Sequence, residues 1–557
     1  MALNDVYDYI VVGAGSAGCV IAARLTEDPG TRVLLIEAGG SDRTPIIAMP
    51  GAIPFAYQSK KINWGIQSGP EPELHGRTID EKAGRVIGGS GSINAMIVNR
   101  GNPMDYEGWS AEGLTDWDWA HVLPYFRKME TFSEGPNAWR GGEGPLKIRR
   151  ARAAHKLFDI FLRAGEQAGF EVAEDHNGFK QEGLHIAQSF IHDGLRWTSA
   201  RAYLRPALGR PNLTLLKHGF VTRLIVRDGR AEGVELSSRG GKHIVRAGRE
   251  VIVSAGAMNS PKLLMLSGIG NPDDLRNLGI TVKAEARDVG ENLQNHPGVD
   301  LQFSARDEDS LTSELGLIGQ ARLAAEWALM RRGRGADHYF EAGAFLRTRD
   351  DVDFPNMQYE FLPLTRQLVK GKLVPVPGFQ FWFDLSRPES RGRITLRSAD
   401  PQAQPSVIFN TYSIPQDLTD MVDGVRLARE LVNQPAWKGI VQAELTPGID
   451  VSSDAEIAEF VRARTGTSYH PSGACRMGTD DRAVVDSECK VNGVEGLRVV
   501  DASVIPRVIT GNLNAPTVMI AEKVADRIRG RQPLAPSDAG FYFKAGASSR
   551  SSDPSQR

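Results

Sequence analysis

The feature that most constrains this fold is a glycine motif near the N-terminus, "GAGSAG" at residues 13–18. Before it lies a short apolar run rich in β-branched residues, Asp8–Val12, and after it Ser16–Glu27 has the apolar spacing of a helix. A second apolar run, Arg32–Glu37, follows. Strand, helix and strand within about 30 residues form a βαβ unit, which requires parallel strands and a right-handed crossover. The sequence therefore predicts a parallel sheet covered by helices.

The spacing of the glycines indicates what this βαβ unit binds. Gly13, Gly15 and Gly18 stand in GxGxxG order, and Glu37 closes the second strand 19 residues after Gly18. Glycine permits the tight turn, the close approach of backbone to a pyrophosphate, and the packing of helix on strand. The helix N-terminus favours negative charge, and a carboxylate at the end of the second strand can accept hydrogen bonds from ribose hydroxyls. The motif alone is weakly specific, but with Glu37 it predicts a bound adenine dinucleotide, either NAD or FAD.

Two later segments repeat the α/β pattern. Val251–Ser254 predicts a strand followed by a helix at Ser260–Leu266. Gly496–Pro506 predicts a strand that runs into a turn, before helical spacing at Ala515–Arg529. Three separated α/β pieces indicate one doubly wound sheet built from distant parts of the chain.

The chain is too long for a single core, so a second domain is expected between these pieces. With 557 residues, two or more domains are the prior expectation. We place the insertion at about Gly298–Arg462, where Arg391–Ser398 alternates like a strand with one solvated face. The polar, Ser-rich stretch from Lys544 to the last residue is expected to be disordered.

Composition excludes several classes of protein. The formal net charge is −2, so no basic excess indicates a nucleic-acid partner. The three cysteines form no CxxC or His/Cys cluster, so neither a disulfide framework nor a metal site is expected. No basic, cleavable leader precedes the first strand, and no apolar run reaches the roughly 18 residues of a membrane span. A cytoplasmic protein is the default expectation, with peripheral attachment to the inner membrane left open.

Five ordered segments carry a family resemblance. "GRVIGGSGSIN" and "GAMNSPKLLMLSGIG" resemble the two signature segments of the glucose–methanol–choline (GMC) oxidoreductases, and "YHPSGACRMG", "GLRVVDASVIP" and "GNLNAPTVMIAEKVAD" resemble that family's C-terminal segments. The likeness runs from about Asp8 to Arg529 and keeps the order of the segments. Within the family, "YFEAGAF" and "VVDASVIPRVITGNLNAPT" are most similar to bacterial choline dehydrogenases and related alcohol dehydrogenases.

The resemblance implies FAD as the cofactor. It places Gly13, Gly15, Gly18 and Glu37 on the ADP half, Val221 near the adenine, and Asp501 on the ribitol–pyrophosphate side. It places Gly89, Ser90 and Asn94 near the flavin. Some members attach FAD covalently through a histidine in the loop after "GG", but this chain has Ile93 there, so a non-covalent flavin is expected. The remaining residues expected to contact the cofactor are Ser16, Ala38, Arg85, Ala95, Met96, Ala255, Gly256, Ala502, Asn512, Pro516 and Thr517.

The expected architecture is α/β with two domains. A Rossmann-like FAD-binding domain comprises residues 1–145, 190–298 and 463–535. A discontinuous substrate-binding domain with an antiparallel sheet comprises residues 146–189 and 299–462. Residues 536–557 form a C-terminal tail that is expected to be disordered.

His470 and Asn512 are the expected catalytic pair. Oxidation of an alcohol needs a base for the hydroxyl proton, and histidine has the suitable ordinary pKa. A second polar group should stabilise the developing alkoxide. From residue type alone, a structural histidine is the better explanation of His470, and Asn514, before the last helix, is as good a candidate as Asn512. The resemblance favours His470 as the base and Asn512 as its partner.

The substrate is less constrained. Glu341, Tyr359, Glu360 and Trp382 lie in aromatic segments that could surround a quaternary ammonium group, although alternating aromatics more often form a sheet core. Glu360 stands where choline dehydrogenases are expected to have histidine, so an uncharged primary alcohol is an equal candidate.

Several alternatives remain open from the sequence. Electrons pass to a quinone, another carrier or, in an oxidase variant, O₂. A flavin-containing hydroxynitrile-type lyase would use the same histidine, and an NAD enzyme would leave the segment 84–96 unexplained. A homodimer is also left open.

Overall fold

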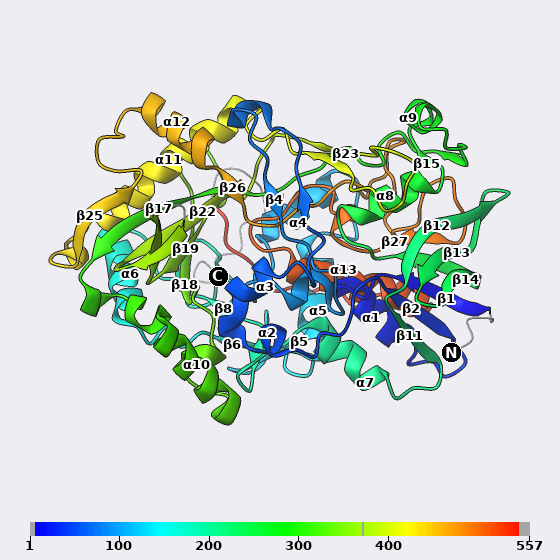
Figure 1. Ribbon diagram of the computed structural model, residues 1–557, viewed down its shortest axis with the longest axis horizontal. Helices are drawn as coiled ribbons and strands as arrows, with labels where there is room; N and C mark the ends of the chain where they lie inside the picture. The colour runs from blue at the N-terminus through cyan, green and yellow to red at the C-terminus, as the bar shows by residue number, and fades with distance from the viewer. Residues whose placement is uncertain (1–5, 370–371, 545–557) are drawn as a thin grey trace.

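The computed structural model describes residues 6–369 and 372–544. Two seven-stranded sheets, each with its own hydrophobic core, lie at opposite ends of the longest axis of the molecule (Figure 1). The predicted disordered residues after Lys544 lie outside the described residues. None of the helices in the described part of the chain is long and apolar enough to cross a lipid bilayer.

The first sheet has the doubly wound arrangement that the glycine motif predicts. Its order is β11-β2-β1-β14-β13-β12, with β27 also paired to β14. β1 runs parallel to both β2 and β14, whereas β14 begins as an antiparallel partner of β13. The strands are β1 Tyr7–Val12, β2 Val33–Glu37, β11 Leu213–Lys217, β12 Phe220–Arg227, β13 Arg230–Ser238, β14 Gly241–Val253 and β27 Leu497–Val499.

The predicted helices of this half are confirmed with small shifts at their ends. They are α1 Ser16–Leu25, α8 Asn259–Leu266 and α13 Asn514–Ile528. α1 ends two residues before the predicted Glu27, where the Thr26 hydroxyl donates to the Ala22 carbonyl at 2.8 Å. A proline at position 29 also prevents the helix from continuing.

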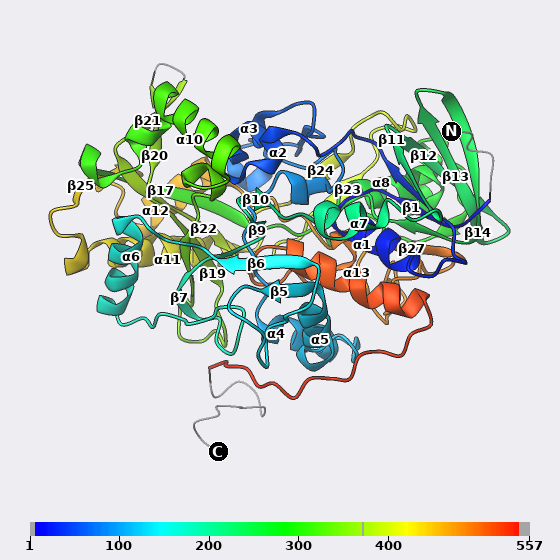
Figure 2. The same cartoon turned by 90° about the horizontal axis from the view of Figure 1, so that it is seen from below.

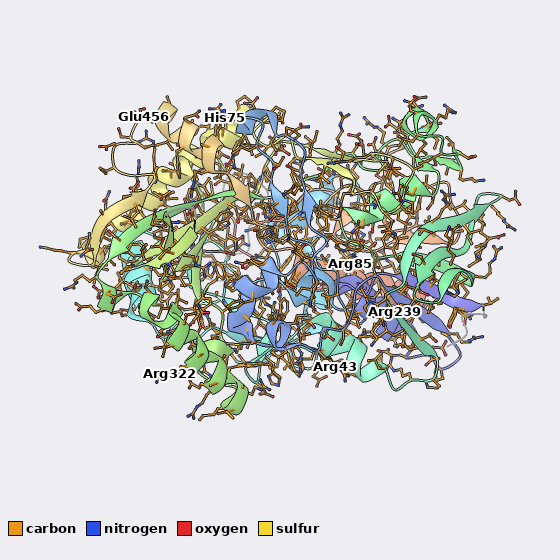
Figure 3. The ribbon with its side chains drawn as sticks, viewed as in Figure 1. Arg43, His75, Arg85, Arg239, Arg322 and Glu456 are labelled. Atoms are coloured by element: carbon orange, nitrogen blue, oxygen red, sulfur yellow. The ribbon has the colours of Figure 1, made fainter. Side chains whose placement is uncertain are left out.

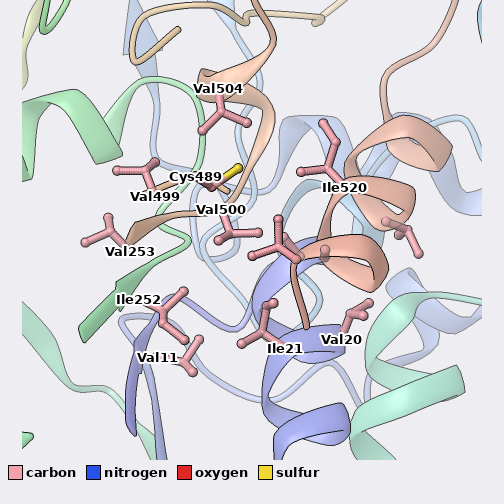
Figure 4. Packing of buried hydrophobic residues seen from close by; sticks show 14 of the residues in the cluster. Val11, Val20, Ile21, Ile252, Val253, Cys489, Val499, Val500, Val504 and Ile520 are labelled. Carbon is pink, nitrogen blue, oxygen red and sulfur yellow. The ribbon is translucent and has the colours of Figure 1, made fainter. Parts of the chain in front are cut away.

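The core of the first sheet is formed by segments that are far apart in sequence. In Figure 4, Val11 of β1, Ile252 of β14 and Val500, directly after β27, lie on the side of the sheet that faces Ile21 of α1 and Ile520 of α13, and all five are fully buried. Burying one such side chain contributes about 1.5–3 kcal/mol. This packing holds the N-terminal and C-terminal segments side by side, and with them the loops that precede α1 and α13.

The second sheet is antiparallel and follows the order β25-β17-β22-β19-β18-β7, with β26 paired to β17. Helices α6 Lys156–Gln167, α11 Pro415–Val432 and α12 Asp454–Arg464 pack on it (Figure 1). The strands are β7 Gly183–Ile186, β17 Pro297–Ala305, β18 Ala342–Leu346, β19 Met357–Leu362, β22 Gly378–Leu385, β25 Val441–Thr446 and β26 Gly466–Thr467.

Two parts of the chain cross the predicted domain boundaries. β26 lies in a segment predicted for the FAD-binding domain but pairs with β17 of the second sheet. β23 Arg393–Thr395 lies in the predicted insertion, pairs with β24 Ser406–Ile408, and buries Ile394 in the first core. At these two points the contacts of the chain do not follow the predicted boundaries, which remain a prediction.

The stretch after α13 differs from the expected disordered tail. Residues 531–544 run in an extended path past α5 and α4 (Figure 2). Backbone amides of Ser537 and Tyr542 donate to the carbonyls of Ala120 and Phe179, and Phe543 is buried. These hydrogen bonds and the buried aromatic side chain hold residues 536–544 against the protein surface.

Apart from α10, the remaining elements are short, and they connect or cover the two sheets. The helices are α2 Pro45–Ala48, α3 Ile53–Gln58, α4 Pro103–Ala111, α5 Trp119–Met129, α7 Arg205–Ala207, α9 Pro272–Asn277 and α10 Leu317–Met330. The strands are β3 Ile66–Gln67, β4 Asp80–Glu81, β5 Glu130–Phe132, β6 Leu146–Arg150, β8 Gln188–Ser189, β9 Ile191–His192, β10 Leu195–Arg196, β15 Ile269–Gly270, β16 Ala284–Glu285, β20 Thr365–Val369 and β21 Lys372–Val376.

Candidate active site

One cavity of ≈ 440 Å³ is lined by residues of both sheets. Its wall on the first sheet is formed by the β1–α1 loop, the end of β2 and the loop after β14. Its wall on the second sheet is formed by side chains of β19 and β22. Residues 467–471 and 512–514 close it between these walls. A cavity of this volume between two packed units is typical of a small-molecule or cofactor site.

The glycines at the first-sheet end leave room that no other residue would leave. Gly13 has φ +101°, and a Cβ there would lie 2.3 Å from the Ser254 carbonyl oxygen. Gly89 has φ +56°, and its Cβ would lie 2.8 Å from the Cα of Gly15. The backbone of two loops therefore meets at van der Waals distance along the cavity wall.

Polar groups at this end suit an anionic pyrophosphate. In the described structure no side chain caps α1, and its first turn carries no acidic residue, so its N-terminal amides face the cavity without a competing acceptor. The buried Ser254 hydroxyl also lacks a hydrogen-bond partner among the described residues. These free donors and the glycine cradle fit the diphosphate of FAD.

Glu37 occupies the place expected for a ribose-binding carboxylate. One oxygen accepts from the Ala14 amide at 3.0 Å and the other from the Gly39 amide at 2.7 Å. Burial raises the pKa of Glu37, and these two backbone hydrogen bonds oppose the rise. Each oxygen keeps a further lone pair, so the carboxylate can accept hydroxyl groups while it fixes the loop.

Asp501 holds two loops of the wall together. Its Oδ2 accepts from the Gly256 amide at 2.8 Å and the Ser260 hydroxyl at 2.5 Å, and its Oδ1 accepts from the Ser503 amide at 2.9 Å. The side chain is thus committed to the protein. Asp501 lines the cavity, and it shapes the wall through these hydrogen bonds.

The catalytic pair predicted from the sequence comes together in the cavity. The Asn512 Nδ2 lies 3.1 Å from the His470 Nε2. The opposite ring nitrogen, Nδ1 of His470, lies 2.9 Å from the Nδ1 of His296. His470 is buried apart from the edge that faces the cavity. Nε2 is therefore the nitrogen available to a ligand.

The hydrogen-bond network assigns the protons of these groups. Asn512 Oδ1 accepts from Asn99 Nδ2 and from Gln358 Nε2, the latter at 3.1 Å, so its amide nitrogen points to His470. His470 Nε2 is then an acceptor, and its Nδ1–H donates to His296. In this tautomer the Nε2 lone pair accepts from Asn512 on the cavity wall.

Electrostatics keep both imidazoles neutral. Burial and the facing ring of His296 hold the pKa of His470 well below its ordinary value. Burial lowers the pKa of His296 to about 3. His470 is therefore unprotonated at neutral pH and can accept a proton.

The second-sheet end carries a half-buried carboxyl group, Glu360, and a buried one, Asp384. Burial, and then the charge of Asp384, raise the pKa of Glu360 to about 8. Burial raises the pKa of Asp384 to about 7, and its Oδ2 accepts from the Ser468 hydroxyl at 2.6 Å. Trp382 lies directly opposite Glu360 in the β19–β22 pair, and its indole N–H donates to Ser468 at 2.9 Å. Carboxyl and aromatic groups thus share one corner of the cavity.

Most predicted site residues lie on the cavity wall. Those lining it are Gly13, Gly15, Ser16, Glu37, Ala38, Gly89, Ser90, Asn94, Ala95, Met96, Val221, Ala255, Gly256, Glu360, Trp382, His470, Asp501, Ala502, Asn512 and Thr517. The competing candidate Asn514 also lines it, but its amide donates to the Ser16 hydroxyl at 2.8 Å.

Three predicted cofactor residues are not among the described residues that line the cavity. Gly18 packs α1 on the sheet, and a Cβ there would lie 1.9 Å from the Gly13 carbonyl oxygen. Pro516 is buried in the first turn of α13. The side chain of Arg85 is exposed at the surface (Figure 3), with its guanidinium 4.8 Å from the centre of the Trp64 ring.

Two predicted substrate residues point elsewhere. Successive residues of a strand face opposite sides, so Glu360 faces the cavity while Tyr359 enters the core and donates to the Gly424 carbonyl of α11 at 2.9 Å. Glu341 accepts from the Ala153 amide at 2.6 Å and from Arg334 at 3.0 Å, away from the lining residues. The structure therefore does not place Glu341 or Tyr359 against a substrate in this cavity.

His296 and the groups around it are not predicted from the sequence. One signal was present: His296–Pro297 repeats the dipeptide His470–Pro471. Neither that repeat nor any spacing shows that the two rings meet, because 174 residues separate them.

Comparisons with known proteins show the family and the fold. Sequence profiles described as GMC oxidoreductase match residues 7–298 and 388–521. The chain is 45% identical over 95% of its length to 97% of a Brucella anthropi protein named oxygen-dependent choline dehydrogenase. Pyridoxine 4-oxidase from Mesorbium loti superposes with a TM-score of 0.85 at 30% identity, covering 94% of this chain and 100% of that one. Formate oxidase of Aspergillus oryzae superposes with a TM-score of 0.89 at 28% identity, covering 95% and 99%.

Proposed function

The chain belongs to the GMC oxidoreductase family and is an FAD-dependent enzyme that oxidises alcohols, and from this premise we propose that His470 is the base and Asn512 the alkoxide-binding group of that oxidation. The single observation that supports the assignment is the 3.1 Å pair of Asn512 Nδ2 and His470 Nε2 on the cavity wall. The dehydrogenase and oxidase names of the relatives do not favour the alternative lyase reaction.

The cofactor would lie along the glycine loops. FAD supplies a hydride acceptor when it is bound. Glu37 would hold the ribose of its adenosine half, and the α1 N-terminus with Gly13 and Gly15 would hold its diphosphate. Ser90, Asn94 and Asn512 would border the flavin half. Ile93 in place of an attaching histidine supports a flavin held without a covalent bond.

The substrate hydroxyl would bridge the catalytic pair. The bound hydroxyl would replace the direct hydrogen bond between Asn512 Nδ2 and His470 Nε2. It would donate to Nε2, and Asn512 Nδ2 would donate to its oxygen. Neutral His470 can then remove the proton, and the Asn512 hydrogen bond strengthens as negative charge develops on the oxygen. His296 would accept from the Nδ1–H of the imidazolium that forms, which stabilises it.

For the substrate, we propose an alcohol that carries an ammonium group, with choline as the first compound to test. The name of the relatives supports choline, and the cavity supplies Glu360 with the ring of Trp382 at the end away from the glycine loops. A cation would be stabilised by the Glu360 carboxylate and by aromatic faces. Neutral alcohols of the same shape are the competing class, and they make no use of a charge at Glu360.

Replacing His470 tests the base directly. Under anaerobic mixing with choline, His470→Ala should reduce its flavin about 10²–10⁴-fold more slowly than the wild type, the usual contribution of a positioned base. The purified variant should remain yellow, because His470 lies away from the glycine loops. Asn512→Ala should slow the same step, whereas Asn514→Ala, which removes a hydrogen bond to Ser16, should act on flavin affinity. Flavin reduction at the wild-type rate in His470→Ala would refute the assignment.

A further inference from the structure

A single amide, that of Asn295, fixes the backbone of both histidines in the site. Its Oδ1 accepts from the His470 amide at 2.9 Å and from the His296 amide at 2.9 Å. The two rings held in this way face each other with their Nδ1 atoms 2.9 Å apart. A rotation of the Asn295 side chain would therefore release both rings together.

The turn that presents His470 needs such support. Tyr469, immediately before it, has φ +62°, a left-handed conformation that costs free energy for a residue with a bulky side chain. The Tyr469 amide donates to the Thr467 hydroxyl at 2.9 Å, and that hydroxyl in turn accepts from Asn295 Nδ2 at 2.8 Å. The strained turn and the two histidines thus share one hydrogen-bond network.

Glu81 decides which way the Asn295 amide faces. It lies in β4, and its Oε1 accepts from Asn295 Nδ2 at 2.7 Å. Because Glu81 and Thr467 both offer acceptors to the nitrogen, the Asn295 oxygen is directed to the two histidine amides. Glu81 is fully buried, and its Oε2 has no hydrogen-bond partner among the described residues. Burial raises the pKa of Glu81 to about 7, which shows the cost of keeping a carboxyl there.

We propose that Glu81 is a positioning residue for alcohol oxidation: acting through Asn295, it sets the place of the His470 imidazole and of its partner His296. The inference rests on the proposed role of His470 as base. Glu81 itself does not line the cavity in the described structure, so it acts on the reaction only through these hydrogen bonds.

The test is the rate of flavin reduction in the intact holoenzyme. Glu81→Ala should reduce its flavin about 10²-fold more slowly at saturating choline, because a displacement of a catalytic group by about 1 Å costs that much. Its flavin absorbance spectrum and its apparent Kd for choline should stay within about twofold of the wild type, since it leaves the residues that line the cavity in place. Glu81→Gln keeps an acceptor oxygen for Asn295 Nδ2 and should restore the rate to within about tenfold of the wild type.

Glu71 provides a matched control. It is also a fully buried carboxylate, and its oxygens accept from the amides of Phe409 at 2.8 Å and Thr411 at 3.2 Å, with no hydrogen bond to Asn295 or to either histidine among the described residues. Glu71→Ala should lower thermal stability by a similar amount and leave the reduction rate unchanged. Equal slowing in Glu71→Ala and Glu81→Ala, or no slowing in Glu81→Ala, would overturn the proposal.

A milder variant covers the case in which Glu81→Ala does not fold. Thr467→Val preserves the shape of the side chain but removes the hydroxyl that binds both Asn295 and Tyr469, and it should slow reduction about tenfold or more. A wild-type rate in Thr467→Val would contradict the network. Failure of the proposed function is distinguishable, because His470→Ala would then reduce its flavin at the wild-type rate whatever Glu81 does.

Discussion

At the scale of single residues, Glu360 is the group whose charge depends most on what occupies the cavity. Its pKa of about 8 means that the neutral acid predominates at pH 7. A bound ammonium group favours the carboxylate, so binding of a cation at pH 7 releases a proton. Since a raised pKa penalises the charged form, affinity for a cationic alcohol increases as pH rises and levels off above about 8.

We therefore expect kcat/KM for choline to rise with pH between about 6 and 8 and then to reach a plateau. His470 does not produce this limb, because its pKa lies well below its ordinary value and it is already neutral there. Steady-state rates across this range provide the measurement. Glu360→Gln should lose about 10-fold or more in kcat/KM for choline and flatten the profile.

A neutral isostere supplies the control for Glu360. 3,3-Dimethylbutan-1-ol has the shape of choline without its charge, so its kcat/KM should change little in Glu360→Gln. A preference of the wild type for the neutral compound at every pH would contradict an ammonium-bearing substrate and favour the uncharged class.

At the scale of elements, the sequence predicts what depends on local pattern. The βαβ unit, α8 and α13 were predictable because glycine spacing and apolar periodicity are local properties. In β19 the same period-2 rule explains why Glu360 reaches the cavity and Tyr359 does not, but the sequence does not say which face is which. The His470–His296 contact and the Glu81–Asn295 bond join loops distant in sequence, so only the folded chain shows them.

The packing of α1 on β1 gives a prediction for this element. Gly18→Ala would place a Cβ 1.9 Å from the Gly13 carbonyl oxygen. That oxygen belongs to the backbone and cannot move aside as a flexible side chain would. The helix must move off the sheet, which we expect to cost about 3 kcal/mol or more of unfolding free energy and to weaken FAD binding. Thermal unfolding and retained flavin absorbance measure the two effects.

Gly108 in the interior of α4 is the matched control for Gly18. A Cβ there meets no atom within 4 Å among the described residues. Gly108→Ala should therefore stabilise the protein by about 0.4–1 kcal/mol, because alanine lowers the conformational entropy of the unfolded chain. If the two substitutions had the same effect, the contact with Gly13 would not be the cause.

At the scale of the whole molecule, the cavity lies where two separate cores meet. The first core supports the glycine loops, and the second supports β19 and β22 on the opposite wall. Residues 467–471 connect these walls, since β26 pairs with the second sheet and His470 faces the site. A ligand that fills the cavity thus adds contacts between units that fold around different hydrophobic clusters.

FAD should therefore stabilise the fold as a whole. Because the flavin is expected to be held without a covalent bond, mild denaturation should release it and allow apoprotein to be prepared. Free FAD at 100 times its Kd should then contribute about 2.7 kcal/mol to the free energy of unfolding and raise Tm in a concentration-dependent way.

Hydrogen exchange should show lost protection in apoprotein at residues 84–96, 254–260 and 467–471, while β19 and β22 keep theirs, since their buried faces pack on α11. If FAD raises the Tm of His470→Ala by the same amount, the stabilisation comes from cofactor contacts and not from catalysis. A Tm independent of FAD would mean that the cavity does not join the two halves.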